Sequence, residues 1–165
     1  MALEPAITEI ESLKDRPAVA ALLAWRPAAL QAAKWDRNEL TLWIDRHSLR
    51  EACARLRDDA TTTYGVLADI TCVDWYPSEP RFEVVYSLLS HARKDRLRLK
   101  VKVDSPDTTI DSMVPLWPGA EPFEREVFDL FGIRFQGNSF LRRILMPDDW
   151  EGHPLRKDYP VEGYR

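Results

Sequence analysis

The stretch that decides the fold is residues 96–103, which read Arg96-Leu97-Arg98-Leu99-Lys100-Val101-Lys102-Val103. Apolar and cationic residues alternate here without a break, and successive side chains of a β-strand point to opposite faces. This period of two places four apolar side chains on one face and four cations on the other. We therefore predict a strand with one buried face and one face toward solvent.

A second strand precedes this one along the chain. Residues 82–89 place four apolar side chains on one face, namely Phe82, Val84, Tyr86 and Leu88. Because the connection at 91–95 is short, the two strands are predicted to form an antiparallel hairpin. Two more strands are predicted from β-branched and aromatic runs, at residues 66–75 and 40–44.

Helices are predicted on either side of these strands. Residues 47–60 carry an apolar stripe at helical spacing, and Ser48 and Glu51 have the spacing of a capping box. Residues 121–131 carry a second stripe, and Gly132 is expected to end that helix. The stripes consist of Leu49, Ala52, Cys53, Leu56 and Ala60, and of Phe123, Val127, Leu130 and Phe131.

The N-terminal part, residues 1–38, is rich in alanine and is predicted to be helical. Pro17 and Pro27 should interrupt it, leaving helical pieces at 18–25 and 28–34. Together these elements predict an α+β fold of two layers. A mostly antiparallel or mixed sheet of four to five strands packs against helices in a single body, residues 1–136.

Residues 137–165 show no periodic pattern, and we call them the C-terminal arm. Pro147, Pro154 and Pro160 forbid a continuous helix, while charges of both signs alternate too irregularly for a strand. The 24 residues 142–165, fully extended, reach about 80 Å, whereas a body of this size is about 40 Å across. The arm has little apparent means of folding on itself, so we expect it to dock on a partner.

Several classes of function are disfavoured by composition. The net charge of -4 and the absence of aromatics among the cations of strand 96–103 argue against nucleic-acid binding. Those cations either bind an acidic partner or, as we favour, protect an edge strand from aggregation. No apolar run reaches the roughly 20 residues of a membrane span, and residues 1–5 lack the features of a secretory signal.

No cofactor site is expected in this chain. Cys53 and Cys72 are the only cysteines, too few for an iron–sulfur cluster, and both lie on apolar faces where a buried thiol is the simplest interpretation. Phosphate-binding and nucleophile-elbow motifs are absent. One alternative is a metal-dependent enzyme that uses acidic and histidine side chains of the arm, namely Asp148, Asp149, Glu151, His153 and Asp158, but a flexible segment would not hold these ligands rigidly.

Three motifs resemble the 30-kDa subunit family of respiratory complex I, the NADH-quinone oxidoreductase. The main ones are Glu124-Arg125-Glu126-Val127-Phe128-Asp129-Leu130-Phe131-Gly132-Ile133 and the run from Leu141-Arg142-Arg143 through Trp150 to His153-Pro154-Leu155-Arg156-Lys157-Asp158-Tyr159-Pro160. A weaker match covers residues 67–75. One departure is Gly137-Asn138-Ser139, where the family usually reads Gly-His-Pro, so no histidine can titrate there.

The resemblance implies a structural and assembly subunit in the hydrophilic arm of a proton-pumping NADH:quinone oxidoreductase. Such a subunit binds no cofactor, lies beside subunits B, D and I, and depends on partners for FMN and iron–sulfur clusters. It implies an indirect, peripheral association with the cytoplasmic face of the cell inner membrane. Relatives also serve ferredoxin-fed photosynthetic and hydrogenase complexes, so the electron donor stays open.

The resemblance also indicates residues for a subunit interface. The set comprises Glu124, Arg125, Glu126, Asp129, Arg142, Arg143, Trp150, Pro154, Leu155, Arg156, Lys157, Asp158 and Tyr159. Within it, the i, i+4 spacing of Arg125 and Asp129 predicts an ion pair on the outer side of the 121–131 helix.

Overall fold

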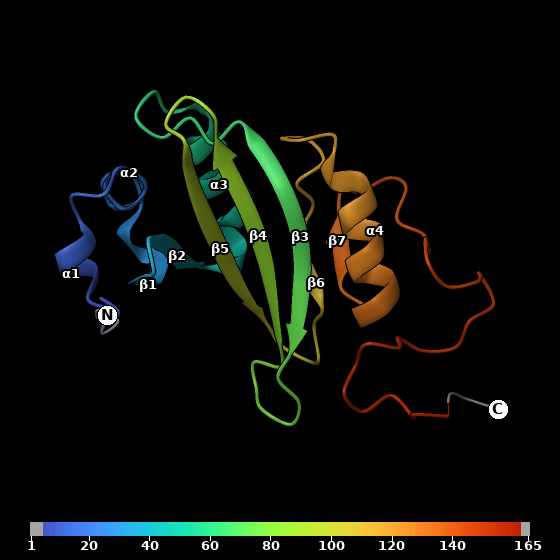
Figure 1. Ribbon diagram of the computed structural model, residues 1–165. Helices are drawn as coiled ribbons and strands as arrows, with labels where there is room; N and C mark the ends of the chain where they lie inside the picture. The colour runs from blue at the N-terminus through green and yellow to red at the C-terminus, as the bar shows by residue number, and fades with distance from the viewer. Residues whose placement is uncertain (1–4, 163–165) are drawn as a thin grey trace.

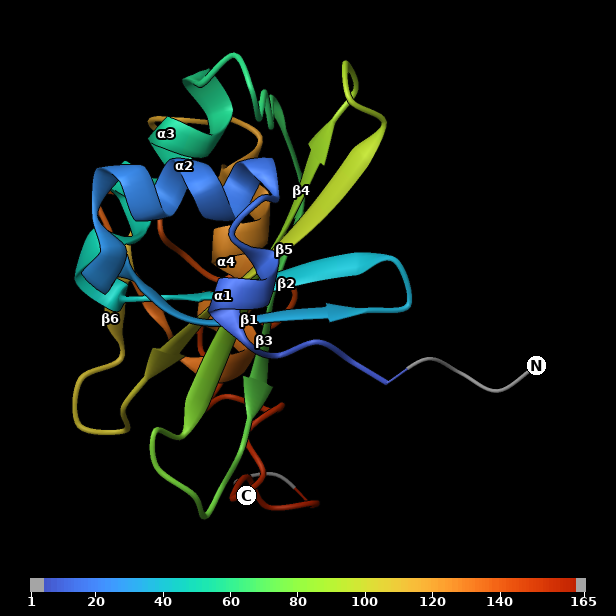
Figure 2. The same ribbon diagram turned by 90° about the vertical axis from the view of Figure 1, so that its left-hand side faces the viewer.

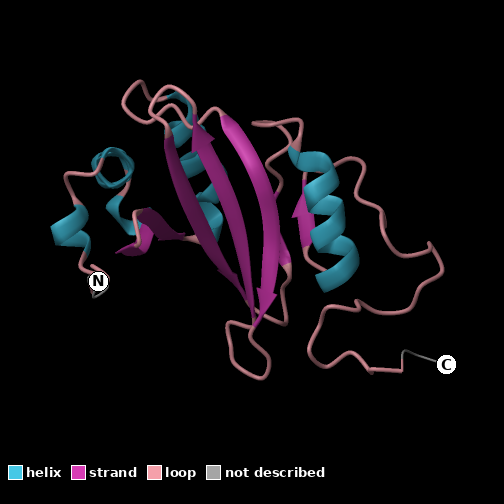
Figure 3. Ribbon diagram, viewed as in Figure 1, coloured by secondary structure: helices cyan, strands magenta, loops and turns pink. Residues whose placement is uncertain are grey.

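The computed structural model describes residues 5–162 of the chain. The helices are α1 (Ile10–Leu13), α2 (Pro17–Trp25), α3 (Leu49–Asp58) and α4 (Ala120–Phe131), with short 3-10 turns η1 (Pro27–Ala29) and η2 (Arg46–Ser48). The strands are β1 (Leu30–Asp36), β2 (Glu39–Ile44), β3 (Val66–Asp74), β4 (Phe82–Ser90), β5 (Asp95–Val103), β6 (Thr109–Asp111) and β7 (Arg134–Gln136). Figures 1 and 3 show this order along the chain.

Five strands form one mixed sheet in the order β1-β2-β5-β4-β3. The predicted hairpin is confirmed, because β4 and β5 pair antiparallel from Phe82 opposite Val103 to Ser90 opposite Asp95. β2 joins β5 in parallel, with Leu40 opposite Leu97. A second, two-stranded sheet of β6 and β7 was not predicted, since its strands are only three residues long.

The core lies between the sheet and the helices, as the predicted two-layer α+β fold requires. The four apolar side chains of β5 are at most 1% exposed, and Cys53 and Leu56 of α3 are fully buried in the same hydrophobic core. In Figure 2 helices α2 and α3 lie to one side of the β4–β5 hairpin. On the face of β4 that alternates with the core residues, Glu83 and Val85 are 5% and 8% exposed. Both cysteines are free and buried, as predicted, and burial raises the pKa of each thiol to about 12.

The N-terminal prediction was partly wrong. Helices α1 and α2 lie in this part, but residues 30–36 form strand β1, which pairs antiparallel with β2. Arg37 and Asn38 join these strands with positive φ angles of 51° and 62°, as in a tight hairpin turn. Pairing with β2 therefore overrides the helix propensity of the alanines. The part of the prediction that concerns residues 1–4 lies outside the described residues.

Two local predictions were also wrong. Ser48 makes no helix-capping hydrogen bond, because its hydroxyl donates to Asp45 and Glu51 pairs with Arg26 instead. The cations of β5 do not protect an edge, since β5 is central in the sheet. Two of them form ion pairs, Arg98 with Glu39 at 2.7 Å and Lys100 with Glu83 at 2.6 Å.

Candidate subunit interface

The C-terminal arm leaves β7 and runs back beside α4 without regular secondary structure (Figure 1). Its contacts with the body fall into three groups. The first lies at the start of the arm, the second surrounds Asp129 in the last turn of α4, and the third joins the arm to the end of α4 and to the β3–β4 loop.

The start of the arm is held by Glu124, which is fully buried on the inner side of α4. Its carboxylate accepts hydrogen bonds from Ser112 Oγ at 2.8 Å, the Met113 amide at 2.5 Å and Asn138 Nδ2 at 2.9 Å. Burial raises the pKa of Glu124, although these donors act in the opposite direction. Asn138 thus connects the arm to a carboxyl group that sits inside the body.

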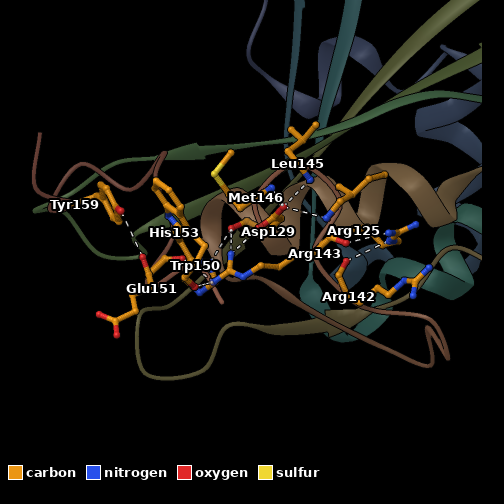
Figure 4. A network of polar contacts seen from close by, with 12 residues as sticks. Arg125, Asp129, Arg142, Arg143, Leu145, Met146, Trp150, Glu151, His153 and Tyr159 are labelled. Carbon is orange, nitrogen blue, oxygen red and sulfur yellow. Dashed lines mark hydrogen bonds and ion pairs between the residues drawn. The ribbon is translucent and has the colours of Figure 1, made fainter. Parts of the chain in front are cut away.

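Asp129 holds the next part of the arm, as Figure 4 shows. Its side chain is fully buried, and one oxygen accepts the amides of Ile144, Leu145 and Met146 at 3.0, 2.8 and 2.9 Å. The other oxygen accepts Arg143 Nη1 at 2.5 Å. Burial favours the neutral acid, but the Met146 amide, Arg143 and the other amides outweigh burial and lower the pKa of Asp129.

The predicted pair of Arg125 with Asp129 is therefore wrong. Arg125 lies 3.4 Å from Glu121 and donates to the carbonyl groups of Arg142 at 3.2 Å and Arg143 at 2.9 Å. Its guanidinium carbon also lies 5.3 Å from the centroid of the Phe140 ring. Asp129 prefers Arg143 because that guanidinium arrives together with three backbone donors.

The end of α4 is capped by the arm. The carbonyl groups of the last residues of a helix have no partner inside it. Here His153 Nδ1 lies 2.9 Å from the Asp129 carbonyl, the Leu155 amide donates to Leu130 at 3.1 Å, and Arg156 Nε donates to Phe131 at 2.6 Å. Gly132 allows this approach, because its φ is +76° and a Cβ there would lie closer than 3.0 Å to Arg156 and His153.

The same third group of contacts also joins the arm to the β3–β4 loop. Arg81 is 7% exposed and makes two hydrogen bonds to Asp74, at 2.9 and 2.8 Å, and two to Asp158, at 2.9 and 2.6 Å. The Lys157 amide also donates to Asp74 at 2.8 Å. Despite its burial, Asp74 has its pKa lowered to about 2 by Arg81 and these amides.

The sequence matches the family described as "Respiratory-chain NADH dehydrogenase, 30 Kd subunit" over residues 42–165, which is most of the chain. The chain belongs to this 30-kDa subunit family. One relative in it is the C subunit of the NADH-quinone oxidoreductase of Roseiflexus castenholzii, 47% identical over 89% of this chain and 85% of the relative. A protein of the same name from Geobacter sulfurreducens is 47% identical over 77% and 78% of the two chains.

Solved structures agree with the 30-kDa family assignment. A chain of the membrane-bound sulfane sulfur reductase, described as an archaeal respiratory membrane complex, is 27% identical and superimposes with a TM-score of 0.74. The match covers 90% of this chain and 86% of that one. A trypsin-resistant fragment (1-134) of Nqo5 is 32% identical with a TM-score of 0.56, over 61% of this chain and 80% of the fragment.

The structure sorts the interface residues that the family motifs suggested into three sets. Glu124 and Asp129 are buried inside the chain, which places both carboxylates away from any partner's surface. The partly exposed residues are Arg125, Arg143, Pro154, Arg156 and Tyr159. The exposed residues are Glu126, Arg142, Trp150, Leu155, Lys157 and Asp158.

The inward position of Glu124 could have been read from spacing. It lies four residues after Ala120 and three before Val127, both buried, so it falls on the apolar stripe of α4. The arm was predicted to have little means of folding on itself, and it lies instead along its own body, where the end of α4 and Arg81 supply polar partners. These polar contacts join parts of the chain that are not neighbours in the sequence, so no local sequence pattern predicts them. Its docking on another subunit stays a prediction.

The arm's acidic residues do not gather for a metal. Within residues 5–162, no three histidine, cysteine, aspartate or glutamate side chains are close enough to hold an ion. His153 instead contacts the Asp129 carbonyl, and Asp158 pairs with Arg81. In the same part of the chain, no helix combines the length and apolar character needed to cross a membrane.

Proposed function

We propose that this chain is a structural subunit, without a cofactor of its own, in the hydrophilic arm of a proton-pumping NADH:quinone oxidoreductase. It supports electron transfer from NADH through iron–sulfur clusters to quinone by holding other subunits together. The observation that carries this proposal is the design of the C-terminal arm. Its polar groups bind the chain's own body, while its large apolar side chains face outward.

The exposed apolar side chains are concentrated in the arm. Of the ten large apolar side chains that are exposed within residues 5–162, six belong to the arm, and they are Phe140, Ile144, Leu145, Trp150, Leu155 and Val161. Scattered single residues of this kind are normal on a surface, but their concentration in one segment favours a contact with another protein. Burial of such side chains contributes about 25 cal/mol per Å² of apolar surface.

The anchors determine how these side chains are presented. Asp129 binds the backbone at Ile144 and Leu145, whose side chains remain 40% and 56% exposed. Because the backbone is already held, a partner that buries them loses less conformational entropy than it would with a free chain. Arg142, exposed beside Phe140, adds a cation that can meet a carboxylate of the partner.

The proposed partners are subunits B, D and I, which together with further subunits hold FMN and the iron–sulfur clusters. We place the assembly at the cytoplasmic face of the cell inner membrane, where this chain would be peripheral. The names of the relatives favour NADH as the electron donor. The similarity to a chain of a sulfane sulfur reductase supports a second candidate function, as a subunit of a related respiratory complex with another electron donor.

The proposal is tested by affinity purification of the tagged chain from its host membranes. The tagged chain should bring down iron–sulfur subunits and NADH:quinone reductase activity, and Ile144→Ser combined with Leu145→Ser should lower that yield about tenfold. Ile7→Ser is the matched control, because Ile7 is also 40% exposed but lies outside the arm. Purification of the unaltered chain alone, without any redox subunit, would refute the function.

A further inference from the structure

A second group of exposed apolar side chains lies outside the arm. Val73, Trp75 and Tyr76 are 36%, 49% and 48% exposed, at the end of β3 and the start of the β3–β4 loop. Val73 and Trp75 are two residues apart on an extended chain, so both point to the side of the sheet away from the core, where Val73 is paired with Glu83. Nine of the ten exposed large apolar side chains within residues 5–162 thus belong to the arm or to this group.

Trp75 lines a groove on that side of the sheet. The groove has a volume of about 640 Å³ and lies between the β1–β2 hairpin and the β3–β4 loop. Ala32 and Trp43 line it from the hairpin, and Trp75 and Pro80 line it from the loop. No arm residue up to 162 lines the groove, although the arm contacts the same β3–β4 loop through Arg81. In Figure 1 the hairpin that forms the other wall lies on the opposite side of β4 from the arm.

The two carboxylates that line the groove are engaged within the chain. Glu83 is 5% exposed and accepts hydrogen bonds from Trp43 Nε1 at 2.9 Å and Lys100 Nζ at 2.6 Å. Glu79 accepts the amides of Arg81 at 2.9 Å and Ser105 at 3.2 Å. Glu83 is therefore held inside the chain, whereas Glu79 is exposed and uses only its Oε2 atom in these bonds.

Two lysines also line the groove. Lys34 pairs with Asp36 at 2.8 Å, whereas Lys102 is exposed and has no ion pair within residues 5–162. An aromatic wall beside an uncompensated ammonium group suits a segment that carries both an apolar side chain and a carboxylate. Tryptophan is also among the residues enriched at the energetically dominant positions of protein interfaces.

We propose that this groove is a second docking surface, which binds an acidic, extended segment of another subunit of the same complex. An apolar side chain of that segment packs against Trp75, and a carboxylate pairs with Lys102. This inference rests on the proposed function, because it assumes that the chain works inside a multisubunit assembly.

The test places a photo-crosslinking amino acid, p-benzoylphenylalanine, at position 75 of the tagged chain in its host. After purification of the intact complex and illumination, mass spectrometry identifies the joined peptide. We expect a peptide of another subunit, with aspartate or glutamate beside an apolar residue. A cross-link to a second copy of this chain, to lipid or to a small molecule, or none at all, would overturn the inference.

Substitutions provide an independent measurement. Trp75→Ser and Lys102→Glu should each lower the yield of assembled complex, the first about tenfold. Lys94→Glu is the matched control, because Lys94 is an exposed lysine at the opposite end of the β4–β5 hairpin. Equal melting temperatures of the isolated variants would show that folding is intact.

The two proposals can fail separately. If the unaltered chain purifies without redox subunits, the proposed function fails. If it purifies with them but Trp75→Ser and Lys102→Glu assemble as well as Lys94→Glu, only the groove inference fails.

Discussion

Replacement of Asp129 by asparagine removes the charge that holds the middle of the arm and keeps almost the same side-chain shape. The asparagine oxygen can still accept the amides of Ile144, Leu145 and Met146, but its NH2 group then faces Arg143. Loss of one partner from a buried ion pair costs about 3–5 kcal/mol. Arg143 keeps the carbonyl groups of Trp150 and Gly152 as acceptors, at 2.7 and 2.9 Å, so we expect the lower end, about 3 kcal/mol.

This cost should appear mainly as local release of the arm. The body has its own core between the sheet and the helices, whereas the arm depends on the three anchor groups. A loss of about 3 kcal/mol corresponds to a roughly 150-fold larger population of the open arm. Hydrogen exchange followed by mass spectrometry measures it directly, because the amides of residues 144–146 are themselves the donors to Asp129.

Asp149→Asn is the matched control, since Asp149 is an exposed aspartate of the same arm. It should leave exchange at residues 144–146 unchanged. If Asp129→Asn also left exchange unchanged, Asp129 would not be the group that holds the arm, and the account of its presentation to a partner would have to be abandoned.

Three further predictions concern the stability of the isolated chain, measured by urea unfolding. Gly132→Ala should destabilise it by about 2–3 kcal/mol. Its control, Gly119→Ala, has open space around the added Cβ and should change stability by less than about 0.5 kcal/mol. Equal effects of the two substitutions would contradict the close approach of the arm to Gly132. Tyr86→Phe should be neutral or stabilising by up to about 1 kcal/mol, because the buried Tyr86 hydroxyl has no hydrogen-bond partner within residues 5–162. Tyr64→Phe should destabilise the chain, because it loses a 2.8 Å hydrogen bond to Asp95. Because the pKa of Asp74 is lowered to about 2, its contribution to the free energy of unfolding should be full above about pH 4 and lost as pH falls toward 2. Asp74→Asn should remove this acid dependence, while substitution of the exposed Asp104 should not.

Local patterns in the sequence were sufficient for much of the fold. The alternation of residues 96–103, where every second residue is a cation, identified β5, and the apolar face of residues 82–89 identified β4. The alanines of residues 28–34 misled, since alanine favours a helix locally while β1 is fixed by its pairing with β2. The parallel pairing of β2 with β5 joins distant segments and has no local signature.

The candidate interface could also be predicted only in part from the sequence. The family motifs located the residues of α4 and the arm, but not which of them face inward. Arg125 and Asp129 have the spacing of an ion pair, yet each has a better partner among arm residues that approach from outside the helix. Helical spacing describes only neighbours on the same helix, so contacts with a segment that lacks periodicity could not be predicted.

The topology of the sheet also bears on the order in which the protein forms during synthesis. The β1–β2 hairpin leaves the ribosome early, but its neighbour in the sheet is β5, with Leu40 opposite Leu97. Until β5 has been made, β2 presents an unpaired edge and the apolar face of the hairpin has no sheet to join. Nascent chains that end before β5 are therefore the species most exposed to aggregation and most in need of a chaperone.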